Sequence, residues 1–292
     1  MQGSIFTAVF MPIALGIIML GLGLGLSLAD FRRVLVYPRA VVIGLACQTL
    51  LLPFVCYAIA RGFGLAPELA VGLMLLSASP GGATANLFSH LAKGDVALNV
   101  TLTATNSLLS LFTLPFIVNL SLAAFMGEDR SIPLQFGKVI QVFAIVLVPV
   151  GLGMLIRARR PSLSTRLERP VKIASVVFLA LIITAAIIKE RATLASAFQA
   201  VGLAALTFNL SSMAIGYFVP RLARLPRRQA TAISMEIGIH NGTLAIAVAS
   251  SPLLLDNTAM AVPPAIYSLI MFFTAAAFAT LSARRAQEGE GA

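Results

Sequence analysis

Long apolar stretches separated by short polar connections run along the chain from about residue 5 to about residue 283. Most are about 20 residues long or longer, enough to cross about 30 Å of hydrocarbon as α-helices. The nine stretches lie near residues 5–28, 39–60, 68–92, 95–126, 134–157, 170–189, 197–220, 227–252 and 260–283. The pattern predicts an all-α polytopic membrane protein, with about nine transmembrane helices in a single domain over residues 1–292.

The amino-acid composition supports a membrane protein. Hydrophobic residues make up 59% of the chain and charged residues 11%, whereas soluble domains carry about 25% charged residues. No basic residue precedes the first apolar stretch, and this stretch is longer than the apolar core of a signal peptide. We therefore expect it to remain in the protein as the first span.

The formal net charge of +10 is divided unevenly between the two sides of the predicted spans. Of the 21 Lys and Arg residues, sixteen lie in one set of alternate connections and five in the other. Such a bias places the basic connections in the cytoplasm. It predicts a multi-pass protein of the inner (plasma) membrane, with the N-terminus outside and the tail, 284–292, in the cytoplasm. The charge therefore indicates topology, and we expect no nucleic-acid partner.

Two of the apolar stretches carry residues that interrupt a helix. The stretch 68–92 contains Ser-Pro-Gly-Gly at 79–82, where proline removes a backbone donor and the glycines loosen the ladder. The stretch 227–252 contains Gly238 and Gly242, which flank Ile-His-Asn and predict a second, weaker break. Irregular backbone at membrane depth is tolerated only where it is buried in protein or lines a wet cavity.

The two interrupted stretches occupy matching positions. Each is the third of a group of four spans, which gives repeat one at about 5–126, a connector helix at about 134–157 and repeat two at about 170–283. Groups that lie five spans apart have opposite orientations, so the order predicts an inverted repeat with two crossing discontinuous helices. Transporters built this way bind substrate and ions where the broken helices cross. The alternative is a pair of kinks without a site.

Glu236 is the only acidic residue that falls inside one of the long apolar stretches. A carboxylate at membrane depth costs several kcal/mol unless it faces a cavity or a cation, so it predicts a transport or coupling site. A protonated Glu that makes structural hydrogen bonds is the alternative. The N–H end of a broken helix suits an anion, and its C=O end together with Glu236 suits Na⁺.

Polar side chains at helical spacing accompany the breaks. Asn99, Thr103, Asn106 and Ser110 form one stripe on the fourth span, and Gln48 lies midway along the second. Each is either a ligand or an ordinary interhelical hydrogen-bonding group.

The sequence offers no pattern typical of an enzyme. Cys47 and Cys56 lie on nearly opposite faces of one predicted helix, and His90 and His240 are far apart without a metal-ligand spacing. We find no arrangement of nucleophile and base. We therefore expect no enzymatic activity, no transition metal and no organic cofactor.

The segments 80–86 (Pro-Gly-Gly-Ala-Thr-Ala-Asn) and 236–241 (Glu-Ile-Gly-Ile-His-Asn) resemble the bile acid:sodium symporter family, in particular its bacterial apical bile acid transporter-like proteins. The resemblance runs along essentially the whole chain and includes Gln48, the segment 94–98 and Val262-Pro263. It implies a core domain with two crossing broken helices, a panel domain that moves against it, and the nine-span form of the family.

The resemblance also implies binding residues. The first sodium site would be formed by side chains of Asn86, Asn99, Thr103 and Glu236, with position 85 adjacent. The second would be formed by Gln48, Glu236, His240 and the backbone carbonyls of Ile237 and Ile239. The organic anion would lie near Ala83, Thr84 and Asn241.

The chain departs from the family pattern at four of these positions. Ala85 and Asn99 stand where many members have Ser, and only Asn offers an oxygen. Ala83 replaces a Thr, so the substrate need not follow that of other members. His240 replaces a Gln; an imidazole nitrogen is a poor Na⁺ ligand, and with a reference pKa of ~6.5 it can carry a proton instead.

These observations predict a sodium-coupled symporter that imports an organic anion by alternating access. The substrate would be bile-acid-like, pantoate-like or another carboxylate, and the partners would be this substrate and the lipid bilayer, with no obligatory protein partner evident. The alternative is a proton-coupled or exchange carrier for a monocarboxylate that uses Glu236 and His240. A cation/proton antiporter, an intramembrane enzyme and an assembly protein fit the pattern less well.

Overall fold

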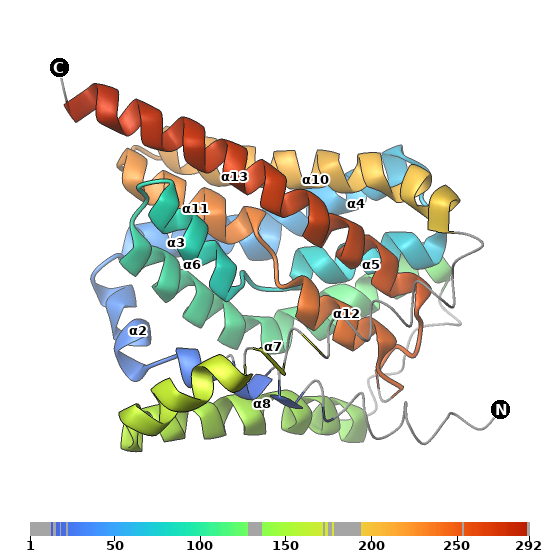
Figure 1. The fold of residues 1–292 in the computed structure, drawn as a ribbon. Coiled ribbons are helices and arrows are strands. Elements are labelled where there is room, and N and C mark those ends of the chain that lie inside the picture. The colour runs from blue at the N-terminus through green and yellow to red at the C-terminus, as the bar shows by residue number, and fades with distance from the viewer. Residues whose placement is uncertain are drawn as a thin grey trace.

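A computed structural model gives the fold (Figure 1). It describes residues 13, 16–17, 19–21, 23–127, 136–171, 173–174, 177, 194–252 and 254–290, without the side chains of 83, 136–147, 194–197, 200 and 285–290. Within these residues every regular element is a helix. About half of the predicted first span and most of the predicted sixth span lie outside the described residues.

The described elements follow the predicted order of spans. The N-terminal ones are α2 (Leu28–Arg32), the 3₁₀ turn η1 (Arg33–Leu35), α3 (Pro38–Ala46), the π-helical turn η2 (Cys47–Leu51), α4 (Leu52–Gly62), α5 (Pro67–Ala78), α6 (Ala83–Leu91), α7 (Val96–Met126) and α8 (Phe136–Arg159). The C-terminal ones are α10 (Leu194–Leu222), α11 (Arg227–Gly238), α12 (Gly242–Ser250), the 3₁₀ turn η4 (Ala259–Ala261) and α13 (Val262–Glu290).

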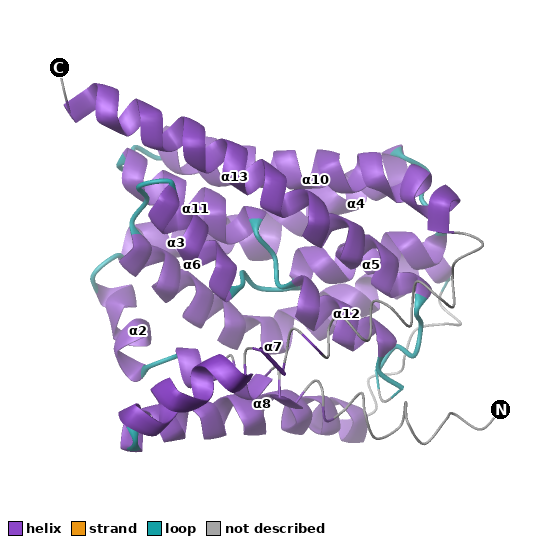
Figure 2. Cartoon of the chain, in the orientation of Figure 1, coloured by secondary structure: helices purple, strands orange, loops and turns teal. Residues whose placement is uncertain are grey.

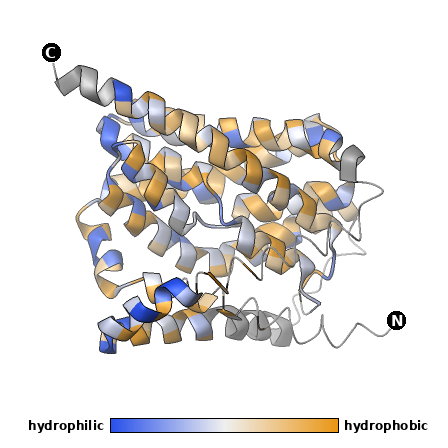
Figure 3. Cartoon of the chain, in the orientation of Figure 1, coloured by the Kyte–Doolittle hydropathy of each residue, from blue (hydrophilic) through white to orange (hydrophobic). Residues whose placement is uncertain are grey.

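Four continuous helical segments in the described part are long and apolar enough to cross a membrane. They are Pro38–Gly62, Val96–Met126, Val201–Leu222 and Ala259–Arg284. Large apolar side chains on their outer faces are exposed, among them Phe54, Phe116 and Phe273. Hydrophobic residues cover most of the helices, whereas hydrophilic ones gather at helix ends, mainly at the left of the view (Figure 3). The chain is thus a helical membrane protein.

Two further apolar segments are each divided into two helices. α5 ends at Ala78, because Ser79 takes an extended conformation and Pro80 has no N–H to continue the ladder. α6 then begins after Gly82. α11 ends at Gly238 and α12 begins at Gly242. The two connecting segments cross near the middle of the molecule (Figure 2). Both interruptions fall at the positions that proline and glycine predict from the sequence.

The turns that lead into the two interrupted segments are copies of each other. Between α4 and α5, Leu65 N–H donates to Ala60 O, and Gly64 has a φ of 60°. Between α10 and α11, Leu225 N–H donates to Pro220 O, and Arg224 has a φ of 59°. Two connections about 160 residues apart therefore share one backbone conformation.

The interrupted helices are packed inside a frame of longer ones. α10 lies along α11 and α13, and α7 lies against α5, α6 and α11. Glycines allow these helices to approach closely. At Gly216 of α10, for example, a Cβ would collide with the Cα of Ser234 on α11. A Cβ at Gly72 of α5 would collide with Met260 O in the same way. The frame thus holds both breaks in its interior.

Candidate functional site

The two interruptions are joined by backbone hydrogen bonds where they cross. Gly81 and His240 form an isolated antiparallel bridge. Gly82 N–H donates to Ile239 O at 3.3 Å, and Asn241 N–H donates to Pro80 O at 2.7 Å. The broken segments therefore satisfy part of each other's freed backbone polarity, as buried irregular backbone requires.

Glu236 lies on the last turn of α11, directly beside this crossing, and is 1% exposed. Its Oε2 accepts a hydrogen bond of 2.6 Å from the Thr103 hydroxyl. The carboxylate lies so close to Gly81 that a Cβ there would overlap it. Oε1 has no hydrogen-bond partner, and within the described residues Glu236 forms no ion pair. A buried carboxylate in this state calls for a cation or a proton.

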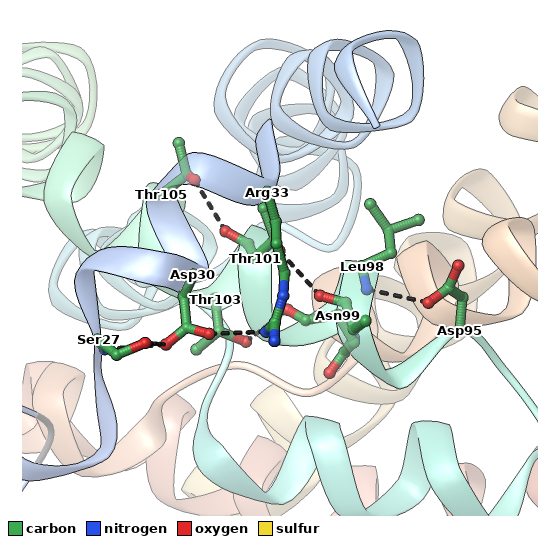
Figure 4. Close-up of polar contacts among 10 residues, drawn as sticks. Ser27, Asp30, Arg33, Asp95, Leu98, Asn99, Thr101, Thr103 and Thr105 are labelled. Atoms are coloured by element: carbon green, nitrogen blue, oxygen red, sulfur yellow. Dashed lines mark hydrogen bonds and ion pairs between the residues drawn. The ribbon is translucent and has the colours of Figure 1, made fainter. Parts of the chain in front are cut away.

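Asn99 and Thr103 lie one helical turn apart on α7 (Figure 4), and both side chains make hydrogen bonds to α11. The Asn99 amide donates to Ala232 O at 2.8 Å, which leaves its Oδ1 buried without a partner. The Thr103 hydroxyl also lies 3.0 Å from Asn99 O. The Oδ1 atom of Asn86, on α6, is likewise buried and unpartnered. Because α6, α7 and α11 pack against one another, the predicted first sodium site is spread over three adjacent helices.

Gln48 lies in the π-helical turn η2, a type of irregularity that is frequent at functional sites. Its Nε2 donates to Ser77 O at 3.1 Å and to Ser79 O at 3.0 Å, at the end of α5. These two carbonyls fix the orientation of the amide, because an oxygen in the place of Nε2 would face them without a proton. Oε1 is left buried and without a partner.

His240 contacts the same end of α5. Its Nδ1 lies 3.1 Å from Ser79 O, and since a carbonyl only accepts, Nδ1 carries the proton of this hydrogen bond. In the neutral ring, Nε2 then carries a lone pair, and this nitrogen is buried without a hydrogen-bond partner. The predicted second sodium site therefore offers the Gln48 amide oxygen and an imidazole nitrogen. Ile237 and Ile239, whose carbonyls complete the predicted site, are buried at the C-terminal end of α11.

The residues predicted to bind the organic anion flank the N-termini of α6 and α12. Thr84 is on the first turn of α6, and the side chain of Ala83 lies outside the described residues. Asn241 is the N-cap of α12, and its side chain accepts from Leu244 N–H at 3.0 Å. Its oxygen is thus already engaged. Each helix begins at the crossing and directs its partial positive charge there.

The rest of the polar stripe on α7 divides in two. Ser110 makes a hydrogen bond within the helix, to Ser107 O at 2.8 Å, whereas the Asn106 amide nitrogen is buried without an acceptor. Cys47 and Cys56 are free thiols. Within the described part of the chain, no group of three or more His, Cys, Asp or Glu residues lies together.

The sequence did not predict a group of residues that contacts Gly238 and His240 at the second break. Asn209 donates to Gly238 O at 3.0 Å, and the Tyr267 hydroxyl donates to the same oxygen at 2.9 Å. Phe208 stacks on the His240 ring at 5.7 Å between centroids. A buried Asn in the middle of an apolar span was the available signal, because such a group must find a partner.

The chain matches known proteins along most of its length. The profile of the Sodium Bile acid symporter family matches residues 12–197. An uncharacterized sodium-dependent transporter of Bacillus subtilis, YocS, is 30% identical over 91% of this chain and 81% of its own. The ileal sodium/bile acid cotransporter of Oryctolagus cuniculus is 24% identical over 94% and 79%, respectively. A probable chloroplastic sodium/metabolite cotransporter of Oryza sativa, BASS2, is 27% identical over 91% of this chain but 62% of its own length.

Proposed function

Because this chain belongs to the Sodium Bile acid symporter family, we propose that it imports an organic anion with Na⁺ by alternating access. Membership of this family makes the chain a transport protein and not an enzyme. One observation carries the proposal. Nine buried side-chain atoms in the described part lack a hydrogen-bond partner, and five belong to the eight residues expected to bind sodium: Gln48, Asn86, Asn99, Glu236 and His240.

The first sodium site is built around Glu236. All three of its unpartnered atoms, on Asn86, Asn99 and Glu236, are oxygens, and the carboxylate supplies the negative charge. A buried oxygen without a donor loses its hydration and gains nothing in return. A hard cation such as Na⁺, bound by all three oxygens, would offset the free energy lost when their hydration is removed. The hydroxyl of Thr103 completes the set, because its lone pairs can face the ion.

The second site contains His240 in place of an oxygen ligand. The Gln48 oxygen, the carboxylate of Glu236 and the carbonyls of Ile237 and Ile239 would bind a second Na⁺, with the lone pair of Nε2 as the weakest ligand. The alternative function, a proton-coupled or exchange carrier for a monocarboxylate, places a proton on this pair of residues. The unpartnered imidazole nitrogen is the observation that favours it.

The anion would bind at the N-termini of α6 and α12. The first turn of a helix carries backbone N–H groups and a partial positive charge that suit a carboxylate. Gly82, the N-cap of α6, has no side chain to occupy them. Thr84 and the amide nitrogen of Asn241 are available as further donors. A bile-acid-like, pantoate-like or other carboxylate fits this chemistry, and the names of the relatives include both bile acid and metabolite carriers.

The proposed architecture is a nine-span inverted repeat. Repeat one covers about 5–126 and repeat two about 170–283, with a connector at about 134–157, a core domain that contains both breaks and a panel domain that moves against it. The matching turns before α5 and α11 support this division. The excess of basic residues supports a cytoplasmic C-terminal tail at 284–292 and an external N-terminus.

Thermal stability in detergent tests the coupling ion. Stability is measured as NaCl replaces choline chloride, for wild type, Glu236→Gln and the exposed control Glu168→Gln. A ligand that binds only the folded state stabilises it by RT ln(1 + [L]/Kd), so wild type and the control should gain stability with Na⁺ and Glu236→Gln should not.

Two results would contradict the sodium mechanism. One is a Glu236→Gln protein that responds to Na⁺ like wild type. The other is a wild type that ignores Na⁺ but changes its stability between about pH 5 and 8, the range in which His titrates. The second result would favour the proton-coupled carrier.

A further inference from the structure

The C-terminal end of α11 is held by a hydrogen-bonded cluster of side chains from α10 and α13. Gly238 O accepts from the Asn209 amide on α10, at 3.0 Å, and from the Tyr267 hydroxyl on α13, at 2.9 Å. Asn209 Oδ1 accepts from the Thr274 hydroxyl at 2.6 Å. Asn209 and Tyr267 are fully buried. Two neighbouring helices thus fix one carbonyl of the break, and every polar atom in this cluster has a partner.

The first break has a counterpart of this cluster. Gln48 donates to Ser77 O across 29 residues of sequence, and Asn209 donates to Gly238 O across the same separation. Each amide belongs to the helix that precedes the interrupted segment, and each binds the C-terminal end of the first half-helix. The two amides differ at their oxygen, because Gln48 Oε1 has no partner whereas Asn209 Oδ1 is bound by Thr274.

The held carbonyl controls the orientation of its neighbours. A peptide unit is planar, so fixing Gly238 O also fixes the N–H of Ile239. Ile239 O accepts from Gly82 N–H, which ties the same segment to the other break. The Tyr267 ring further packs edge-on against His240 at 5.5 Å. Contacts from α10 and α13 therefore help to fix the conformation of the backbone from Ile237 to His240.

We propose that Asn209 and Tyr267 are positioning residues for sodium coupling. They hold Gly238 O, and through it they aim the carbonyls of Ile237 and Ile239 and the Glu236 side chain at the cation. Neither residue touches the ion, since their polar atoms are used within the cluster. This inference rests on the proposed sodium site.

The test measures two Na⁺ concentrations, the apparent Kd fitted to the gain in thermal stability with NaCl and the concentration at half-maximal transport, which we call the Na⁺ midpoints. Asn209→Leu keeps the branching and the number of side-chain heavy atoms but removes both hydrogen bonds of Asn209, and Tyr267→Phe removes only the hydroxyl. The matched controls are Asn119→Leu, at a half-buried Asn on α7, and Tyr217→Phe, at a Tyr that makes aromatic contacts. We expect Asn209→Leu to raise both Na⁺ midpoints roughly fivefold and Tyr267→Phe roughly threefold, since a hydrogen bond contributes about 1 kcal/mol. The controls should match wild type.

A purely structural role gives a different result. It would lower the melting temperature in choline chloride and leave both Na⁺ midpoints unchanged, which would overturn the inference. If Asn209→Leu does not fold, Tyr267→Phe decides the question alone, because the aromatic ring and its packing remain. A wild type without any Na⁺ response would instead refute the proposed function, so the two failures are distinguishable.

Discussion

The break between α5 and α6 and the break between α11 and α12 reach one crossing by different means. The first is opened by its own sequence, since Pro80 lacks an N–H and Gly82 caps α6 without a side chain. The second contains no proline. It begins after Gly238, whose carbonyl is held by two neighbouring helices, and Asn241 caps α12 with its side chain.

The difference teaches how a symmetric frame becomes an asymmetric site. Both breaks receive an amide from the preceding helix, but only the amide of the first break keeps an unpartnered oxygen. The second break contributes the charged residue, Glu236, and the imidazole of His240. In the proposed mechanism, the first break thus supplies neutral ligands and close approach, and the second supplies charge and a rigidly placed backbone.

The largest effect is expected from a substitution that disrupts the contact between Gly81 in the first break and Glu236 at the end of α11. Gly81→Ala places a Cβ on the Glu236 carboxylate, so the carboxylate must leave its position beside the crossing and its bond to Thr103. We expect transport below about a tenth of wild type, a loss of about 1.4 kcal/mol or more in sodium binding. Sodium-dependent uptake by vesicles measures the transport.

Gly82→Ala is the control for this substitution. The nearest atom to its added Cβ is Thr84 Oγ1, at 3.5 Å, and its backbone is extended with a φ of −104°. The Na⁺ midpoint of Gly82→Ala should stay close to wild type, whereas that of Gly81→Ala should rise, because only the Cβ at position 81 meets the Glu236 carboxylate. Equal rises in the two variants would show that general disturbance of the break, and not the contact with Glu236, weakens sodium binding.

An intermediate effect compares the two amides. Gln48→Leu removes two hydrogen bonds to the end of α5 and the unpartnered oxygen, whereas Asn209→Leu removes the bond to Gly238 O and the bond from Thr274. We expect the Na⁺ midpoint to rise at least about tenfold for Gln48→Leu, against roughly fivefold for Asn209→Leu. A NaCl titration of thermal stability gives both values, with the exposed Gln199→Leu as control. The reverse order would remove Gln48 from the ligand set.

The smallest effect concerns the caps. Asn241→Ala removes the side-chain cap of α12, worth about 1 kcal/mol, but keeps the backbone bond to Pro80 O. The melting temperature in choline chloride should fall by about 2–4 °C. Gly82→Ala has no cap to lose and should melt like wild type. An unchanged melting temperature for Asn241→Ala would mean that the cap does not stabilise α12.

Features fixed by local chemistry were predictable from the sequence. Proline and glycine act on the backbone wherever they stand, so the breaks at 79–82 and 239–241 follow from residue identity. The burial of Glu236 follows from its place in an apolar stretch. The continuous spans around α7 and α13 follow from length and hydropathy.

Features set by tertiary contacts were not predictable. The π-helical turn at Gln48 inserts extra backbone just before Pro53, and the sequence does not show how the helix accommodates this proline. The contact between Gly81 and Glu236 joins residues 155 positions apart, and only the fold brings them together. Asn209 is one polar residue among many, and its role depends on which carbonyl faces it. The orientation of the termini and the count of nine spans stay predictions.

The crossing itself is made of main-chain atoms, in the bonds from Gly82 to Ile239 and from Asn241 to Pro80. Every residue type except proline brings the same N–H and C=O groups, so these two bonds do not themselves require particular side chains at Gly82, Ile239 and Asn241. Side chains around the joint can therefore differ while the two backbone bonds stay the same. The relatives named for metabolite and for bile acid transport, 27% and 24% identical to this chain, are proteins in which this can be examined.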